Sequence, residues 1–159
     1  MTGMRNIRLS FVRENVSAVA ILLDDAAPAT CACIWNLLET PFEGYAVHAM
    51  WTGRELSLPI PPDRFPHQEG LLLPPENQTV FPLPGDLVWN SYAPHQWQGV
   101  QDPVYDFGIF YGRDSRLFLP MGWKAGNRFG RIAENLEEFA AVAARCQTEG
   151  RKMIRIERY

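Results

Sequence analysis

A histidine and a glutamate stand close together in residues 45–60, which read YAVHAMWTGRELSLPI. The stretch alternates apolar and polar residues around a Thr-Gly pair, a pattern typical of a β-hairpin. If Thr52-Gly53 is a two-residue turn, His48 faces Ser57, Met50 faces Glu55, and His48 and Glu55 share one outward face. A neighbouring carboxylate orients an imidazole and raises its pKa, so His48 and Glu55 are candidate catalytic residues, with His48 as general base.

The same pair has a structural interpretation. One histidine and one glutamate also occur together on an ordinary solvated sheet face. A three-residue loop would shift the register by one residue and separate them. The sequence alone does not decide between the catalytic and the structural interpretation of this pair.

Three further residues are candidates for binding a substrate. Tyr111 and Arg113 follow a strand pattern punctuated by glycine, and an arginine binds a carboxylate through two parallel hydrogen bonds. Trp89 belongs to the segment WNSYAPHQW, whose aromatic side chains suit the wall of a ligand pocket. The structural alternatives are a solvated hairpin end at Arg113 and aromatic packing beneath a loop at Trp89.

No metal and no cofactor are predicted. His48, Glu55 and His95 match a site of two histidines and one carboxylate in residue type, but only the fold would bring them together. Position 50, two residues after His48, is methionine, so the His-x-His pattern of metal-binding cupins is missing.

Composition restricts the class of protein. A chain of 159 residues, 47% apolar and 21% charged, fits one domain over residues 1–159. The net charge of −3 gives no basic surface for nucleic acid, and no apolar run approaches the roughly 18 residues that span a membrane. We expect a cytoplasmic protein with a small-molecule ligand, a possible homo-oligomer, and three cysteines that stay free thiols.

The elements that must position these residues are mainly strands. Alternation predicts strands over residues 7–12, 19–23, 86–89, 104–111 and 153–157, and helical spacing predicts helices over 28–40 and 131–147. Residues 59–84 are rich in proline and predict a long loop. Trp123, Lys124 and Arg128 are placed in a loop before the second helix. The order predicts a closed β-barrel with two helices covering its ends and with neighbouring terminal strands.

A family resemblance agrees with this architecture. The segment LLDDAAPATCACIWNLLE resembles the start of a cyclophilin, where a hairpin leads through an acidic residue and Pro-x-Thr into the first helix. With VHAMWTGRELSLPIP, LPGDLVWN and FGIFYGRDSRL, nearly the whole chain resembles a bacterial family of cyclophilin-like proteins without a settled activity. The resemblance implies a closed eight-stranded barrel with two helices.

The resemblance does not carry prolyl isomerase activity. Cyclophilins have a Phe-His-Arg stretch after the first helix, where this chain reads YAVHAMW, and their two pocket-lining segments are missing. Opine synthases such as mikimopine synthase look like members of the same fold and act on small molecules. We predict a binding protein or enzyme for a carboxylate-bearing metabolite; the alternatives are a non-catalytic interaction module and a residual peptidyl-prolyl isomerase. Whether the protein is an enzyme stays open.

Overall fold

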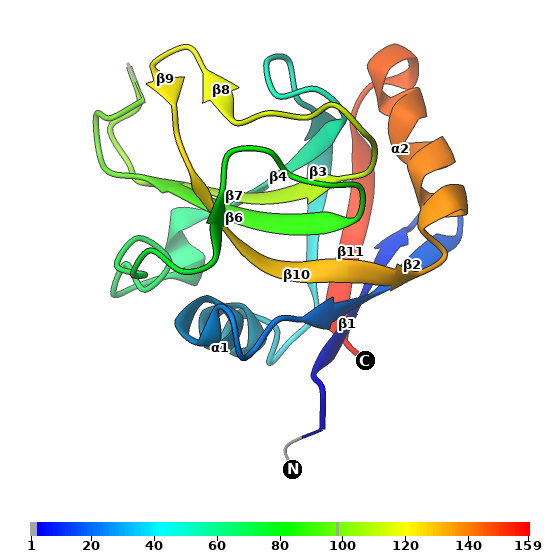
Figure 1. The fold of residues 1–159 in the computed structure, drawn as a ribbon, viewed down its shortest axis with the longest axis horizontal. Coiled ribbons are helices and arrows are strands. Elements are labelled where there is room, and N and C mark those ends of the chain that lie inside the picture. Colours follow the sequence, from blue (N-terminus) through cyan, green and yellow to red (C-terminus); the bar gives the residue numbers. More distant parts are fainter. Residues whose placement is uncertain (1–2, 98) are drawn as a thin grey trace.

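Eight antiparallel strands close into a barrel in the computed structural model, which describes residues 3–97 and 99–159 (Figure 1). The barrel strands are β1 (Asn6–Phe11), β2 (Val16–Leu22), β3 (Phe42–His48), β4 (Glu55–Ile60), β6 (Asp86–Tyr92), β7 (Val104–Phe110), β10 (Gly126–Glu134) and β11 (Lys152–Arg158). They follow the order β2-β1-β11-β3-β4-β7-β6-β10, and pairing of β2 with β10 closes the ring. The predicted mainly-β closed barrel with two α-helices is therefore confirmed.

The remaining elements lie around this barrel. They are the helices α1 (Pro28–Leu37) and α2 (Leu136–Glu149), the 3-10 turn η1 (Pro62–Arg64), and the short strands β5 (Gln78–Thr79), β8 (Phe118–Leu119) and β9 (Gly122–Trp123). The predicted pairing of the terminal strands is confirmed, because β1 lies antiparallel to β11 with Leu9 opposite Ile156.

Alternation along the strands fills the barrel. Ile7, Leu9 and Phe11 of β1 are fully buried, while the residues between them are partly exposed. Deeper in the interior, Phe107 and Phe129 pack edge to face with ring centroids 5.1 Å apart. Each such side chain contributes roughly 1.5–3 kcal/mol on burial, so the period-two pattern is the main source of the fold's stability.

The second predicted helix was placed too early. Residues 131–134 belong to β10, which pairs with both β6 and β2, and α2 begins only at Leu136. Asn135, with a left-handed φ of 62°, turns the chain from strand to helix. The predicted loop before the helix was also wrong, since Trp123 lies in β9 and Arg128 in β10.

Residues 114–125, called the flap below, cover the outer face of β6 and β7 (Figure 1). The flap carries the β8–β9 hairpin. Its Leu117 is buried in an outer apolar cluster with Val88 and Phe110, separate from the barrel core. Backbone hydrogen bonds from Arg116 to Thr52 (3.0 Å) and from Leu117 to Val80 (2.8 Å) fix its position.

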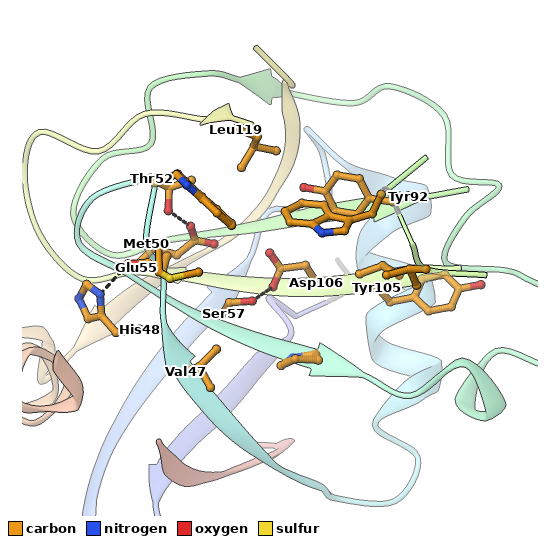
Figure 2. A pocket seen from close by; sticks show the side chains of 16 residues that line it. Val47, His48, Met50, Thr52, Glu55, Ser57, Tyr92, Tyr105, Asp106 and Leu119 are labelled. Carbon is orange, nitrogen blue, oxygen red and sulfur yellow. Dashed lines mark hydrogen bonds between the residues drawn. The ribbon is translucent and has the colours of Figure 1, made fainter. Parts of the chain in front are cut away.

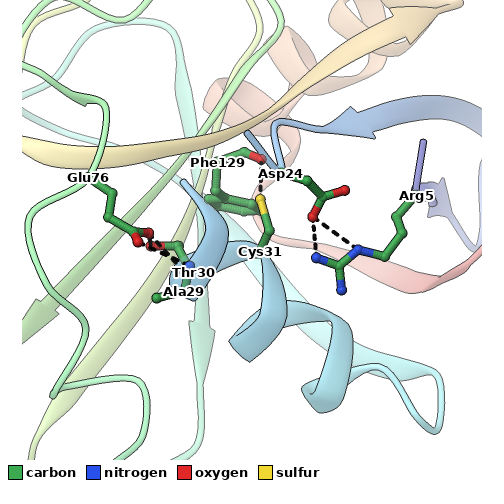
Figure 3. Close-up of polar contacts among 7 residues, drawn as sticks. All are labelled: Arg5, Asp24, Ala29, Thr30, Cys31, Glu76 and Phe129. Carbon is green, nitrogen blue, oxygen red and sulfur yellow. Dashed lines mark hydrogen bonds and ion pairs between the residues drawn. The ribbon is translucent and has the colours of Figure 1, made fainter. Parts of the chain in front are cut away.

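The proline-rich loop is tied to the first helix by one carboxylate (Figure 3). Ala27 at the start of α1 provides no side-chain cap. Glu76 fills this role: it accepts the Ala29 N–H (3.0 Å), the Thr30 N–H (2.9 Å) and the Thr30 hydroxyl (2.8 Å). Burial opposes ionisation of Glu76, but the hydrogen bonds outweigh it and lower its pKa.

We expect Glu76→Ala to lower the free energy of unfolding by about 1–2 kcal/mol at pH 7, because the substitution removes the cap of α1. A lowered pKa in the folded state means that this stabilisation is present above pH 4.5 and is lost as the pH falls further. Urea denaturation at pH 7 and about pH 4 measures both effects. Glu39→Ala, at an exposed position after the same helix, is the control; equal losses from the two substitutions would contradict the capping role.

Candidate functional site

The hairpin between β3 and β4 has a different register from the predicted one. Val47 lies opposite Ser57, His48 lies opposite Leu56, and the Ala49 N–H donates to the Glu55 carbonyl (2.9 Å). The connection therefore spans residues 50–54 instead of two residues. His48 shares a face with buried Leu56, whereas Glu55 and Ser57 lie on the opposite face. The prediction that His48 and Glu55 share one face is wrong.

His48 is instead joined to Tyr111, and its predicted proximity to that residue is confirmed. Its Nε2 lies 2.6 Å from the Tyr111 hydroxyl and its Nδ1 lies 2.9 Å from the Ala49 carbonyl oxygen. A carbonyl only accepts, so Nδ1 carries a proton and donates to Ala49, while Nε2 is paired with the Tyr111 hydroxyl. Burial raises the pKa of Tyr111, which keeps the phenol protonated as a donor.

A cavity of about 300 Å³ opens on the outer face of the barrel, beneath the flap and beside the 50–54 loop (Figure 2). Its walls are mostly apolar and aromatic. The Trp97 ring lies 5.8 Å from that of Trp51 and 5.2 Å from that of Tyr92. The full lining comprises Val47, His48, Ala49, Met50, Trp51, Thr52, Glu55, Ser57, Pro59, Tyr92, Trp97, Val100, Val104, Tyr105, Asp106 and Leu119.

Two carboxyl groups line this cavity, Glu55 from β4 and Asp106 from β7 (Figure 2). Glu55 is 3% exposed and accepts a hydrogen bond from the Thr52 hydroxyl, while Asp106 accepts one from Ser57 (2.7 Å). Burial raises the pKa of Glu55 well above 4.5, and the charge of Asp106 adds to this. Burial also raises the pKa of Asp106 to about 6, against the hydrogen bond from Ser57. Asp106 can therefore hold or release a proton near neutral pH, and Glu55 holds its proton more tightly than an ordinary glutamate does.

Gly108 makes room for one of these carboxyl groups. It lies opposite Ser57, on the outer face of β7. A Cβ atom at this position would stand 2.7 Å from Glu55 Oε1 and 3.2 Å from the Val88 carbonyl oxygen. The lack of a side chain at Gly108 therefore allows the close approach of the Glu55 side chain.

Asp106 was missed by the sequence analysis. It lies on the same outer face as Gly108, two residues along β7, and is joined to Ser57 on the neighbouring strand. The available signal was an acidic residue two positions before Gly108, since a glycine within a strand often marks a place of close approach. Only the pairing of β4 with β7 identifies its partners.

Two of the predicted binding residues lie away from this cavity. Trp89 points into the barrel, where it is 3% exposed and its indole N–H donates to the Gly70 carbonyl (2.8 Å). Arg113 is exposed after the end of β7. Tyr111 is buried and reaches the cavity only through His48. Of the five predicted site residues, His48 and Glu55 line the cavity.

Metal ligation finds no support in residues 3–97 and 99–159, where no group of three or more His, Cys, Asp or Glu side chains is arranged to hold an ion. His95, the third ligand considered, is exposed. Over the same residues, no helix has the length and apolarity needed to cross a membrane. Cys31, Cys33 and Cys146 are free thiols.

Solved structures similar to this chain share its fold at low sequence identity. A structure of McbB in complex with tryptophan has a TM-score of 0.68 and 17% identity, over 96% of this chain and 44% of that one. This chain thus spans less than half the length of McbB. The hypothetical protein AF2241 from Archaeoglobus fulgidus has a TM-score of 0.59 and 18% identity over 100% of both chains.

The third structure establishes the type of barrel. The Mimivirus cyclophilin has a TM-score of 0.57 and 14% identity, over 98% of this chain and 89% of that one, so the fold is cyclophilin-like. No curated protein matches the chain. A family model described as "Protein of unknown function (DUF3830)" matches residues 9–157.

Proposed function

The chain belongs to the DUF3830 family of proteins of unknown function, and we propose that it binds a small organic molecule in the outer cavity and acts on it by proton transfer. The observation that carries this proposal is a pair of carboxyl groups in an aromatic pocket, the buried Glu55 and the partly buried Asp106. A volume of about 300 Å³, mostly apolar walls and a few polar groups are typical of ligand sites. The tryptophan complex of McbB offers a precedent on a similar fold.

The two carboxyl groups have different proposed roles. Asp106, with a pKa of about 6, is largely ionised at pH 7 and accepts a proton from the ligand as general base. Glu55, whose pKa is raised well above 4.5 by burial and by the charge of Asp106, holds its proton more tightly and donates it as general acid. Thr52 and Ser57 orient them through their hydroxyl groups.

His48, the general base of the sequence-based hypothesis, receives a positioning role in this proposal. Both of its ring nitrogens are engaged, by Ala49 and by Tyr111, and these contacts hold the end of β3 at the border of the cavity. A carboxylate-bearing ligand held by Arg113 is not favoured, because the lining within the described residues contains neither arginine nor lysine.

A thermal-shift screen of metabolites tests the proposal. A ligand at 100 times its Kd stabilises the folded state by about 2.7 kcal/mol, which is readily measured as a higher melting temperature. Amide chemical-shift changes should place the hits at Ser57, Val104 and Asp106. Hits that map to another face of the barrel, or a metabolite library without hits, would reject the proposed site.

We expect turnover of a proline peptide far below that of ordinary cyclophilins. The YAVHAMW stretch lacks the arginine of the Phe-His-Arg motif, and no other arginine of the described chain lines the cavity. A protease-coupled peptide assay measures the rate, with a cyclophilin as positive control. Turnover near the cyclophilin rate would restore the isomerase hypothesis.

An interaction module is the second candidate function, favoured by one surface feature. Phe81, Phe118 and Trp123 form an exposed aromatic cluster at the flap, in which the Trp123 ring lies 5.6 Å from Phe81 and 5.0 Å from Phe118. Apolar patches of this kind mark contact surfaces. Sedimentation analysis of the wild type and of Trp123→Lys tests whether this cluster supports the proposed homo-oligomer.

A further inference from the structure

The distribution of charge around the cavity restricts what it can bind. The titratable groups in its lining are Glu55, Asp106, His48, Tyr92 and Tyr105. The cation Lys124 lies outside the lining, with Nζ 5.0 Å from the centroid of the Tyr92 ring. Ionisation of either carboxyl group therefore gives the cavity a negative potential, which attracts cations and repels anions.

The hydrogen bonds of the two carboxyl groups leave one oxygen of each for a ligand. Thr52 donates to Oε2 of Glu55, and Ser57 donates to Oδ1 of Asp106. Glu55 Oε1 and Asp106 Oδ2 receive no hydrogen bond from the described residues. Neither oxygen is sealed off from the cavity, and both carboxyl groups belong to its lining, so a ligand can reach them. A ligand with several N–H donors satisfies both oxygens.

Aromatic walls add a second attraction for positive charge. Trp51 and Tyr92 flank Trp97 at ring-centroid distances of 5.8 and 5.2 Å. The faces of such rings attract ammonium groups by about 0.5–2 kcal/mol each, and they also pack against flat apolar groups.

We propose that the cavity recognises a protonated amine carried on an apolar, ring-sized body, with its nitrogen bound between Glu55 and Asp106. This inference rests on the proposed small-molecule function and names the ligand class for the same site. On binding, the amine displaces the proton of Glu55 to solvent; it then donates to Glu55 Oε1 and Asp106 Oδ2, and the aromatic walls cover the body of the ligand.

Cation binding is coupled to proton release, which predicts a pH dependence. An ionised carboxylate binds an ammonium group well, and a protonated one binds it poorly. Burial places the pKa of Asp106 at about 6, so raising the pH from 6 to 8 increases the ionised fraction before binding. Affinity for the amine should rise over this interval, while affinity for a neutral compound should stay constant.

Three indole compounds of matched shape test the proposal: tryptamine as cation, tryptophol as neutral analogue and indole-3-propionate as anion. Isothermal titration calorimetry at pH 6 and 8 measures their affinities. We expect tryptamine to bind at least tenfold more tightly than the other two at pH 8, and to release protons on binding. The Glu55→Gln/Asp106→Asn variant should lose this preference and retain tryptophol binding. Glu43→Gln, an exposed charge change on β3, is the control.

Equal affinity for tryptamine and tryptophol, or tighter binding of indole-3-propionate, would overturn the cation inference while leaving a small-molecule cavity in place. Failure of all three probes overturns it as well. In that case the metabolite screen tests the proposed function separately. Hits in the cavity would support small-molecule binding without the preference for amines. A screen without hits would reject both the proposed function and the amine inference.

Discussion

Glu55→Gln combined with Asp106→Asn is expected to raise the melting temperature of the protein at pH 8 and to leave it nearly unchanged at pH 4. A carboxyl group whose pKa is raised by folding binds its proton more tightly in the folded state. The contribution of such a group to stability is complete below its ordinary pKa and is lost as the pH rises through the folded value. Asparagine and glutamine keep the acceptors for Ser57 and Thr52 but carry no charge.

The size of this change in stability follows from the pKa of Asp106. Its pKa rises from 3.8 to about 6 on folding, and each unit corresponds to about 1.4 kcal/mol, so its ionisation lowers stability by roughly 2–3 kcal/mol at pH 8. Glu55 adds to this in the same direction. Thermal unfolding at pH 4, 6 and 8 measures the change. Glu43→Gln removes only an exposed ion pair and should shift the melting temperature little. A double variant with the wild-type pH profile would show that neither carboxyl group has a raised pKa in the folded protein.

Gly108→Ala is expected to destabilise the protein by about 1–3 kcal/mol and to remove ligand binding at the cavity. The new methyl group would stand 2.7 Å from Glu55 Oε1, so the carboxyl group must move away from its position beside Thr52. Chemical denaturation measures the first effect and calorimetry with a cavity ligand the second. Gly3→Ala is the control, because a Cβ atom there has no neighbour within 4 Å.

A double-mutant cycle separates crowding of Glu55 from other effects of the alanine. In a Glu55→Ala background the closest contact is gone, so Gly108→Ala should be less destabilising than in the wild type. The contacts with Phe110 and the Val88 carbonyl oxygen, each at 3.2 Å, remain. An unchanged cost in both backgrounds would mean that Gly108 serves the backbone and not the carboxyl group.

The barrel was predictable because each strand is marked by the alternation of apolar and polar residues within a short segment. Ile7, Leu9 and Phe11 alternate with polar residues, and this period alone defines a strand with one buried face. Where the period breaks, prediction failed. The pairing of β10 shifts between Arg128 and Gly130 and again between Ile132 and Glu134. These irregularities disrupt alternation, so the end of the strand was assigned to a helix.

The geometry of the site was not predictable, because it depends on contacts between segments that are distant in the sequence. Thr52-Gly53 has the composition of a tight turn, but the Thr52 carbonyl accepts the Arg116 N–H from the flap, and Gly53 lies where a Cβ atom would be 3.2 Å from the Ser115 Cα atom. The glycine therefore allows close approach of the flap, and the loop is longer than two residues. This one-residue difference in register placed His48 and Glu55 on opposite faces of the hairpin.

The small outer cluster of Val88, Phe110 and Leu117 has a kinetic consequence. Leu117 is the flap's buried side chain in that cluster, whereas the barrel strands share a much larger core. The amide hydrogens of the flap should therefore exchange with deuterium through local opening, while those of β1 and β11 should exchange only through global unfolding. Since Leu119 of the flap lines the cavity, each such opening also removes one apolar wall from the cavity.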